Sequence, residues 1–540
     1  MQYNKRRILP YRLNPIASIL GVSALVALSV NATDLTVSSK SQQPQLEHIT
    51  QAELNALVDS DPHEAFITAF EVGDEIFEIE ANELDGVGAN VGNGERFSKV
   101  PRMDLDGSEE WASHIPARDT GPNGQACTEC HLKPFADGAG PIAGNNVRDP
   151  LRTGDISDFI TRQPPHVFGI GAKQLLAEEM TADLHAIRDA ASDRAQSRNK
   201  VIVRTLTTKG VKFGKIKALP NGDFDFSMID GIDEDLIVKP LQWKGVEPTI
   251  RSFVRGAENN EIGLQAKELV GAGNDNDFDG VVDELGVGDI TALAIYQAGQ
   301  PRPVTKIELA SYGLMDLSRA DKMAILSGES LFHQAKCDTC HKPTLYLDDP
   351  VFSEPSQRET HRDAMFPSGD NPVLMGLSPE KAITFDLTKD MPDNLMTLAD
   401  GRQVHLGNFQ KDRYGKTIVN IFSDLKRHDL GPGIAESVDE KDTGHSVFIT
   451  QPLWGAGSTA PYMHDGRSPT IADAIMWHGG DAANSRRAFK RLSAQDQQAL
   501  IAYVENNILL LAEEEEGEEA EGGHSGLFDL SKEKEDLFGF

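Results

Sequence analysis

The sequence is poor in cysteine, in aromatic side chains and in positive charge. Its 540 residues include four cysteines and 6% aromatic residues, and 52 lysines and arginines stand against 84 aspartates and glutamates. The resulting formal charge of −32 argues against binding to nucleic acid or to anionic membranes, and it favours solubility or a basic partner. Part of the excess negative charge lies near the C-terminus, where Glu513–Glu516 and Glu518–Glu521 begin an acidic tail that is predicted to be solvated.

Long hydrophobic runs are also scarce, and the one candidate lies near the N-terminus. Residues 1–32 combine a basic start, an apolar run at Ile16–Val30 and the small-residue sequence Val30-Asn31-Ala32, which predicts a cleaved secretory signal. The run of about 15 residues is shorter than the roughly 20 that a membrane span requires, and an uncleaved anchor is the alternative. Cleavage would change the formal charge from −32 to −36, because it would remove Lys5, Arg6, Arg7 and Arg12.

All four cysteines fall in two copies of one pentapeptide, Cys127-Thr-Glu-Cys130-His131 and Cys337-Asp-Thr-Cys340-His341. In this CxxCH motif two thiols bond covalently to a porphyrin, and the adjacent histidine binds its iron. The sequence therefore predicts two covalently bound haem c groups with His131 and His341 as proximal ligands. Because haem c is attached outside the cytoplasmic membrane, we expect a bacterial periplasmic protein without integral membrane association after signal cleavage.

Two other uses of paired cysteines fit this pattern less well. A zinc site would use CxxC pairs, but it would not need a histidine at the same offset in both copies. A thioredoxin-like dithiol would need one CxxC on a βαβ background, which the sequence does not show. No cysteine is left over for a structural disulfide.

Four sequence blocks occur twice in the same order: CxxCH, FIT followed by GxG, xxGxxPTI, and a terminal amphipathic helix. Trp243–Ile250 aligns without gaps with His464–Ile471, and the helical pattern of Asp289–Tyr296 recurs at Asp496–Tyr503. This order predicts an internal duplication. The expected fold class is mainly α, with two cytochrome c-like haem domains, long loops and an N-terminal extension.

The expected segments are a signal peptide at 1–32, an N-terminal extension at 33–110, the first haem domain at 111–300, a linker at 301–322, the second haem domain at 323–510 and an acidic tail at 511–540. Residues 172–240 interrupt the first half as an insertion. Its start, around Lys173–Ser197, is predicted to be helical because apolar residues recur there at helical spacing.

The gapless alignment predicts different surroundings for the two irons. His478 lies seven residues beyond Ile471, and the matching residue of the first half is Ala257. If His478 is the distal ligand of the second iron, that haem is suited to electron transfer, whereas the first haem keeps an open site for a small oxidant. Met476 or Met463 is the alternative distal ligand.

An open haem needs a side chain that moves protons during cleavage of an O–O bond. Glu258 and Glu261 directly follow the vacant ligand position, and Glu261 is the preferred catalytic candidate. Trp243, which aligns with His464, is predicted to carry electrons between the haems, with core packing as the alternative. His166 is a further candidate for the pocket.

A calcium ion is predicted at five acidic side chains of one short segment: Asp275, Asp277, Asp279, Asp283 and Glu284. Oxygen ligands at alternating positions with a glycine at the sixth are typical of the start of a calcium loop. The twelfth position is Gly286 instead of the usual glutamate, so one of the last two acidic residues would complete the shell. An acidic turn without a metal is the alternative.

Blocks between residues 100 and 510 carry a resemblance to one family: CTECH, LIVKPLQWKG, PTIRSF, NNEIG, DNDFDGVVDE, CDTCHKP, DDPVFSEPS, DLKRHDLGPG, LWGAGSTAPYMHDGR and WHGGDAANSR. They resemble the di-haem oxidoreductases, which are described as peroxidases or thiol oxidoreductases within the di-haem cytochrome c peroxidase superfamily. The thiol label finds no support here, because no cysteine remains free.

In the peroxidases of that superfamily, APYxHDG precedes the distal ligand of the electron-transfer haem, which is usually methionine. The resemblance puts His478 at this position and implies a bis-His haem of lower potential. Trp243-Lys-Gly245 resembles their WDG motif, and Glu261 resembles their active-site glutamate. Their preceding glutamine is missing near Phe253, and no histidine follows the first CxxCH at the spacing of their gated ligand, which implies a first haem that is open at rest.

These observations predict an exported, peroxidase-like di-haem c-type oxidoreductase. Hydrogen peroxide, or alternatively dioxygen, would react at the first haem. A small electron-donor protein or another reductant would supply electrons through the second haem, and no nucleic acid partner is expected. The alternatives are a di-haem oxygenase, a protein-tryptophan oxidase and a non-catalytic electron carrier.

Overall fold

The computed structural model describes residues 44–87, 98–105, 107–141, 144–362 and 371–512. The predicted signal peptide at 1–32 and the acidic residues from 513 onward lie outside this part of the chain. Within the described ranges, no helix has both the length and the apolar character needed to cross a membrane.

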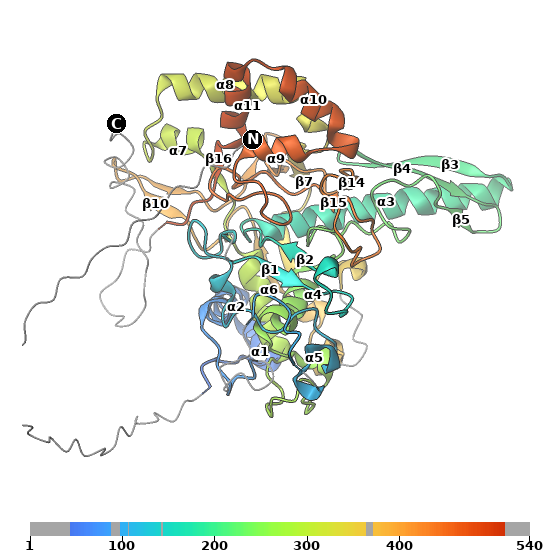
Figure 1. The fold of residues 1–540 in the computed structure, drawn as a ribbon, viewed down its shortest axis with the longest axis vertical. Helices are drawn as coiled ribbons and strands as arrows, with labels where there is room; N and C mark the ends of the chain where they lie inside the picture. The colour runs from blue at the N-terminus through green and yellow to red at the C-terminus, as the bar shows by residue number, and fades with distance from the viewer. Residues whose placement is uncertain (1–43, 88–97, 106, 142–143, 363–370, 513–540) are drawn as a thin grey trace, which may run out of the picture. The chain divides into compact units, whose positions relative to one another are not determined.

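Helices make up most of the regular structure (Figure 1). They are α1 (Gln51–Ser60), α2 (Pro62–Glu78), α3 (Ile170–Arg198), α4 (Ile250–Ala257), α5 (Lys267–Val270), α6 (Val287–Ala298), α7 (Lys306–Tyr312), α8 (Arg319–Gln334), α9 (Ile471–Trp477), α10 (Ala483–Arg491) and α11 (Ala494–Val504). Three short helical turns matter for the site: η4 (Cys127–Glu129), η8 (Cys337–Thr339) and the π-helical turn η7 (Glu258–Ile262).

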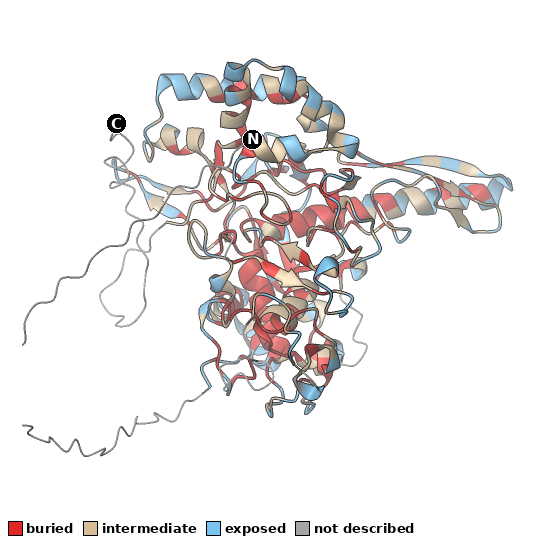
Figure 2. Ribbon diagram, in the orientation of Figure 1, coloured by how far each residue is buried: buried red, intermediate tan, exposed pale blue. Residues whose placement is uncertain are grey.

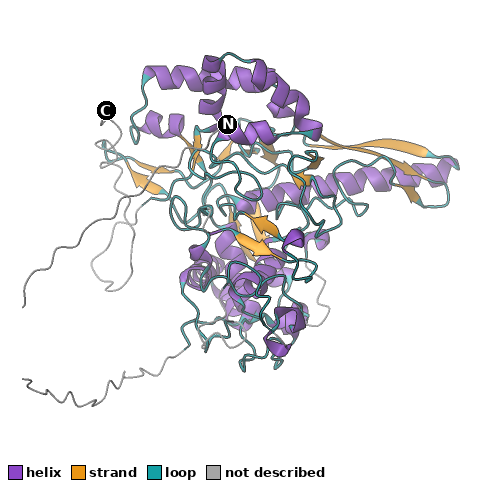
Figure 3. Cartoon of the chain, viewed as in Figure 1, coloured by secondary structure: helices purple, strands orange, loops and turns teal. Residues whose placement is uncertain are grey.

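Apart from the longer pair β3 and β4, the strands in the described residues are short, and they pair in small antiparallel sheets among long loops (Figure 3). The two-stranded pairs are β1 (Asn146–Arg148) with β2 (Ile160–Arg162), β6 (Val304–Thr305) with β16 (Asn507–Ile508), β8 (Val351–Glu354) with β9 (Ile383–Asp386), β10 (Leu395–Thr397) with β11 (Gln403–His405), and β14 (Arg427–Asp429) with β15 (Val447–Ile449). The three-stranded sheets are β3 (Ile202–Thr208), β4 (Val211–Ala218) and β5 (Phe224–Asp225), and β12 (Gln410–Lys411), β13 (Thr417–Val419) and β7 (Leu345–Leu347). The chain is therefore helical with small local sheets, which agrees with the coarse fold prediction.

Helix α2 packs along α6, and a glycine lets the two backbones approach closely. A Cβ atom on Gly73 would lie 2.3 Å from the carbonyl oxygen of Ala292 and 2.6 Å from the Cβ of Tyr296. Every residue of α6 is buried (Figure 2). The predicted amphipathic character of this helix was therefore wrong, because α1, α2, α3 and α4 cover it from several sides.

The second half contains the same helix pair. A Cβ atom on Gly328 of α8 would lie 2.0 Å from the carbonyl oxygen of Ala499 and 2.8 Å from the Cβ of Tyr503, both on α11. In the repeated helical block, where Asp289–Tyr296 matches Asp496–Tyr503, Ala499 matches Ala292 and Tyr503 matches Tyr296. Helix α2 thus packs on α6 through a glycine as α8 packs on α11. Residues 33–110, which contain α2, were predicted to be an N-terminal extension.

The predicted helix at the start of the insertion is confirmed as α3. The sequence did not predict the rest of the insertion, where β3, β4 and β5 form a sheet in which Ile202 pairs with Ala218 and Ala218 with Phe224. Ala191 and Ala195 of α3 pack against this sheet. The segment 301–322, predicted as a linker, holds β6, α7 and the first turn of α8.

One hydrophobic cluster joins the two halves of the chain. Phe66 of α2 stacks on Phe385 of β9, with 4.4 Å between ring centroids and 19° between ring planes. A smaller cluster surrounds Phe332 and Leu500 beneath α8 and α11.

We expect Gly73→Ala and Gly328→Ala each to lower the free energy of unfolding by about 1–3 kcal/mol, because each added methyl group forces a packed helix pair apart. Thermal or denaturant unfolding measures this loss. Ser327→Ala, at an exposed position beside Gly328, should change stability by less than about 0.5 kcal/mol. Equal stability of the glycine variants and this control would contradict the close crossing.

Candidate functional site

Both CxxCH motifs line one mainly apolar cavity of about 540 Å³. It extends from Cys127 and His131 to Cys337 and His341, and Trp243 also lines it. All four cysteines are free thiols. A largely apolar cavity with two pairs of free thiols on its wall fits large, flat hydrophobic groups that are bonded through those thiols.

Each motif folds as one tight turn that carries its histidine back toward the first cysteine. The backbone N–H of His131 donates to the carbonyl of Cys127 at 3.0 Å, and that of His341 donates to the carbonyl of Cys337 at 2.9 Å. The turns are η4 and η8. The two motifs therefore present their thiols and imidazoles to the cavity through the same local geometry.

At the second motif, two imidazoles face each other across the cavity. The ring centroids of His341 and His478 are 6.2 Å apart. With metal–nitrogen bonds of about 2 Å on both sides, and the ring radius added, two imidazoles on one ion have centroids roughly 6 Å apart. The residues present therefore fit a six-coordinate iron at this site.

Backbone carbonyls fix the tautomer of both rings. Nδ1 of His341 lies 3.0 Å from the carbonyl of Phe422, and Nδ1 of His478 lies 2.8 Å from the carbonyl of Ala474. Because a carbonyl only accepts, each Nδ1 carries the proton and each Nε2 remains a ligand atom. Burial lowers the pKa of His341 to about 4 and also lowers the pKa of His478, so both rings are neutral near pH 7.

The repeated PTI block explains how His478 is placed. Thr470 caps α9 by accepting from the backbone N–H of Asp473, and the helix ends directly before His478. Thr249 caps α4 in the same way by accepting from Ser252. The equivalent position at the end of α4 is Ala257, where the chain continues into the π-helical turn η7.

The surroundings of His131 differ from those of His341. Its Nδ1 donates to the carbonyl of Gly138 at 3.2 Å, and burial lowers its pKa to about 4. In the described part of the chain, no second histidine ring faces it at the separation found for His341 and His478. The aromatic ring packed on it is Phe77 at 5.9 Å, and His166, another histidine of the cavity, is held to the carbonyl of Trp454 at 3.0 Å.

Of the two glutamates proposed for proton transfer, Glu261 lines the cavity. Its Oε2 accepts from the side-chain amide of Asn123 at 2.6 Å and from that of Asn146. Burial raises the pKa of Glu261, and Arg148 and Asn123 partly oppose this shift. Glu258 instead lies against Cys127, with 3.8 Å between Oε1 and Sγ. π-Helical turns are frequent at functional sites, and this one directs the two carboxylates to different places.

Trp243 contacts the second half of the chain. Its Nε1 donates to the carbonyl of Gln163 at 2.8 Å, and its ring meets that of His464 edge-on at 6.4 Å between centroids. His464 in turn stacks on Phe448 at 4.4 Å. The aligned residues Trp243 and His464 therefore lie together in a row of rings along the cavity.

The cavity also contains buried cations that were not predicted from the sequence. Arg148 and Arg162 come from the paired strands β1 and β2, and both line the cavity. Nη2 of Arg148 lies 2.6 Å from Asp119, and Nη2 of Arg162 lies 2.7 Å from Glu440. Burial lowers the pKa of a further lining residue, Lys173, to about 7. No motif marks these residues, because strand pairing and long-range ion pairs bring them to the site.

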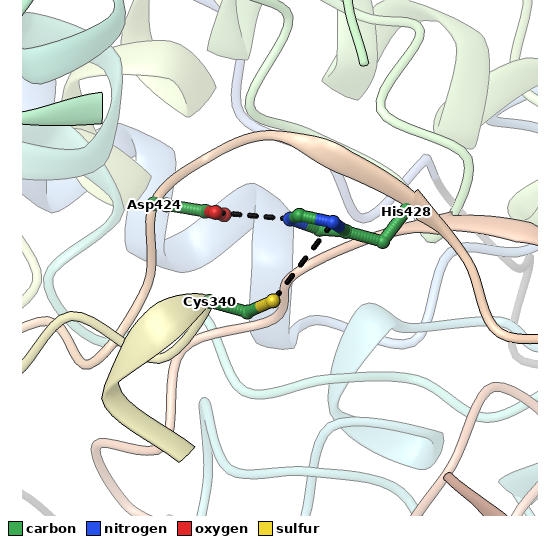
Figure 4. Close-up of side chains that lie close together, drawn as sticks. All are labelled: Cys340, Asp424 and His428. Carbon is green, nitrogen blue, oxygen red and sulfur yellow. Dashed lines mark hydrogen bonds and ion pairs between the residues drawn. The ribbon is translucent and has the colours of Figure 1, made fainter. Parts of the chain in front are cut away.

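A histidine outside the predicted ligand set lies beside the second motif. Figure 4 shows His428 between Cys340 and Asp424, with Nε2 2.9 Å from Asp424 and Nδ1 3.8 Å from the sulfur of Cys340. Burial opposes protonation of His428, but the hydrogen bonds to Asp424 and Cys340 outweigh it and raise the pKa to about 10. DLKRHDLGPG contains both Asp424 and His428, so the block carrying this pair was visible in the sequence although its position was not.

Three of the five predicted calcium ligands lie close together in the structure. Carboxylate oxygens of Asp275, Asp277 and Asp279 lie within 4.8 Å of one another, and Arg118 binds Asp277 at 2.9 Å. Among the described residues, Oδ1 of Asp277 and Oδ2 of Asp279 are buried without a hydrogen-bond partner. Burial and the charge of Asp277 raise the pKa of Asp279 to about 7.

The last two predicted calcium ligands behave differently from each other. The pKa of Glu284 is raised well above its usual value by burial and then by the charges of Asp277 and Asp279, and its Oε2 accepts from the backbone N–H of Gln265 at 2.6 Å. Asp283 instead faces Lys267 at 3.4 Å and accepts from the backbone N–H of Gly273. The unpartnered carboxylate oxygens of Asp277 and Asp279 fit a hard cation, whereas Asp283 is turned to Lys267.

Residues 397–507 match the family model described as "Di-haem oxidoreductase, putative peroxidase". The resemblance to di-haem oxidoreductases is confirmed over this segment. It contains His428, His464 and His478, and it supports an oxidoreductase that uses two haems.

A similar solved structure is titled "Crystal structure of a MauG-like protein associated with microbial copper homeostasis". It is 16% identical, and the similarity covers 53% of this chain and 77% of that chain with a TM-score of 0.26. No curated protein matches the chain.

For the aspartate cluster, we expect metal analysis to find calcium that a chelator removes. Calcium at 100 times its Kd should then restore about 2.7 kcal/mol of unfolding free energy. Asp277→Asn combined with Asp279→Asn should abolish this response, whereas Asp283→Asn should retain it because Asp283 faces Lys267. A protein that carries no calcium and does not respond to it would contradict the prediction.

Proposed function

We propose that this chain is an exported, peroxidase-like di-haem c-type oxidoreductase. Hydrogen peroxide is reduced at an open first haem, and electrons reach it through a bis-His second haem. The first haem is held by Cys127, Cys130 and His131, and the second by Cys337, Cys340, His341 and His478. When bound, the haems supply the one-electron chemistry and the site for the oxidant.

The unequal surroundings of His131 and His341 carry this proposal. A second imidazole stands 6.2 Å from His341, whereas Ala257 has the corresponding position in the first half. If a haem is bound at each motif, His341 and His478 would together hold the second one and leave no free position there, which suits electron exchange. His131 alone would hold the first one and leave room for a small oxidant, which is the division of labour that peroxide reduction requires.

Glu261 is proposed to move the protons. Reduction of one peroxide molecule to two water molecules consumes two electrons and two protons. Asn123 and Asn146 hold one carboxylate oxygen of Glu261 and orient the group at the cavity wall. Its ionised form accepts a proton from peroxide and returns it to the departing oxygen, and its raised pKa makes this return easier.

Trp243 is proposed to lie on the electron path. Its ring lines the cavity that both motifs share, and His464 and Phe448 continue the row of rings into the second half. The hydrogen bond from Nε1 to Gln163 fixes the indole in this place.

The matched helix pairs support the proposed duplication into two haem domains. The crossing of α2 and α6 at Gly73 and that of α8 and α11 at Gly328 use aligned partners on α6 and α11. We therefore propose that residues 62–78 belong to the first haem domain and not to an extension around it.

The resting ferric protein is expected to show one high-spin and one low-spin haem by electron paramagnetic resonance. His478→Ala should convert the low-spin signal to high-spin, because it removes one axial imidazole. His445→Ala, at an exposed histidine, is the control and should leave both signals intact. Two low-spin haems at rest would favour a pure electron carrier, and loss of the low-spin signal in Met476→Ala or Met463→Ala alone would contradict ligation by His478.

Glu261→Gln should lower peroxide turnover by about 10²–10⁴-fold, the usual contribution of a positioned acid–base group. Visible spectra of both haems should remain unchanged. Because the ionised form of Glu261 acts first, activity should fall as the pH drops through the raised pKa of this group. The acid limb of the pH profile of kcat/KM should therefore lie above pH 4.5, which is the ordinary pKa of a glutamate. The limb should disappear in the variant.

Glu258→Gln is the matched control, since it makes the same chemical change three residues earlier, at a carboxylate that lies against Cys127. A larger loss of turnover in this control than in Glu261→Gln would reverse the assignment of the proton-transfer group. Equal turnover of dioxygen and peroxide by the reduced protein would instead favour an oxygenase.

A further inference from the structure

Helix α10 is a basic surface element in an acidic chain. It carries Arg486, Arg487, Lys490 and Arg491 and no acidic residue, whereas the whole chain has a formal charge of −32. Arg486 donates to the carbonyl of Met476 at 3.2 Å, and Arg487 donates to Asn484. In the part of the chain that the structure describes, no ion pair joins any of these four cations to a carboxylate, so their charge is not neutralised locally.

The helix lies directly over the second haem site. Ser485 and Arg486, in its first turn, line the cavity together with His341 and His478. The hydroxyl of Ser485 donates to the carbonyl of Lys336, which directly precedes Cys337. Because a helix with its side chains is about 10–12 Å across, a protein bound to the outer face of α10 would be separated from this site by one helix.

An exposed apolar spot adjoins the basic helix at the end of α9. Met476 and Trp477 are each 37% exposed, although both are large hydrophobic residues. The guanidinium of Arg467 lies 5.0 Å from the centroid of the Trp477 ring. Tryptophan, methionine and arginine are enriched in protein–protein interfaces, and Trp477 directly precedes the candidate ligand His478.

We propose that Met476, Trp477 and the cations of α10, together called the α10 surface, dock an acidic electron-transfer protein. Charge complementarity selects the partner, because unpaired cations attract a carboxylate-rich surface and Met476 and Trp477 give the contact its apolar centre. One electron leaves the reduced partner, which is oxidised, and reduces the second haem, and no atom is transferred. This inference rests on the proposed electron-transfer role of that haem and adds the place and the charge of its donor.

The acidity of the rest of the chain does not prevent this docking. The Debye length is about 10 Å at an ionic strength of 0.1 M, so an approaching partner responds mainly to the charges of the surface it meets. Attractive surface charge raises association rates by 10–10³-fold, and the effect falls as salt is added. The α10 surface should therefore act on the rate of reduction and not on the chemistry at the first haem.

The test measures how fast the second haem is reduced by the hydroquinone form of flavodoxin, an acidic redox protein, in a stopped-flow experiment that follows the low-spin haem bands of the full chain. For the native chain, the second-order rate constant should fall as ionic strength rises. The variant Arg487→Glu/Lys490→Glu/Arg491→Glu should lose about tenfold or more at low ionic strength. Arg486 stays unchanged, because it lines the cavity.

The matched control is Lys200→Glu/Lys212→Glu/Lys215→Glu, which changes the net charge equally at three exposed lysines near β3 and β4. Its rate constant should stay within about twofold of the native value. Photoreduced deazaflavin, an uncharged small reductant, should reduce all three proteins at the same rate. Equal losses in both triple variants, or no loss in either, would overturn the proposal.

A truncated variant that ends at Ala512 tests whether a partner protein or the acidic tail of the chain itself binds to the α10 surface. Its rate with flavodoxin should match that of the full chain. If truncation speeds the reaction and the α10 variant removes this gain, the acidic tail of the chain itself covers the surface, which would overturn the assignment to a partner. Peroxide plays no part in these measurements, so failure of peroxide turnover would contradict the proposed function without affecting the docking result.

Discussion

The site depends on hydrogen bonds that hold each candidate iron ligand by its Nδ1. Gly138, Phe422 and Ala474 supply the carbonyl acceptors for His131, His341 and His478. These contacts fix a neutral tautomer and direct Nε2 into the cavity, as outer-shell partners of ligating histidines generally do. The acceptor for His478 lies one turn earlier in its own helix, so the position of this ring depends on α9 and therefore on the cap at Thr470.

The first half has the same cap and the same helix, and it diverges only at the helix end. Helix α4 begins at Thr249 as α9 begins at Thr470, but after Ala257 the chain makes a π-helical turn instead of leaving the helix. The extra residue in such a turn rotates the following side chains relative to an α-helix. Glu261 reaches the cavity wall while Glu258 turns to Cys127. One helix end thus presents an imidazole to the cavity in one half and a carboxylate in the other.

Local sequence determined what could be predicted. The CxxCH turns, the threonine cap of the PTI block and helix α3 each depend on interactions between residues that are close in sequence. The sequence pattern therefore predicts these structures. The role of α2 could not be predicted, because Gly73 lies far before Cys127 in the sequence whereas Gly328 lies just before Cys337. The sheet of β3, β4 and β5 and the buried arginines depend on partners that are distant in sequence.

Buried ion pairs then explain how the two halves keep their geometry. Arg148 and Arg162 belong to strands of the first half, whereas Glu436 and Glu440 belong to the second. An unpaired buried charge is costly. A shift of one half relative to the other would leave buried arginines or glutamates without their partners, so these ion pairs oppose such a shift. Lys244 lies 3.3 Å from Glu436 and directly follows Trp243, so the same network fixes the indole against His464. Glu436 also lies 3.5 Å from Nε2 of His464, so one buried carboxylate contacts both the residue after Trp243 and the ring that Trp243 meets.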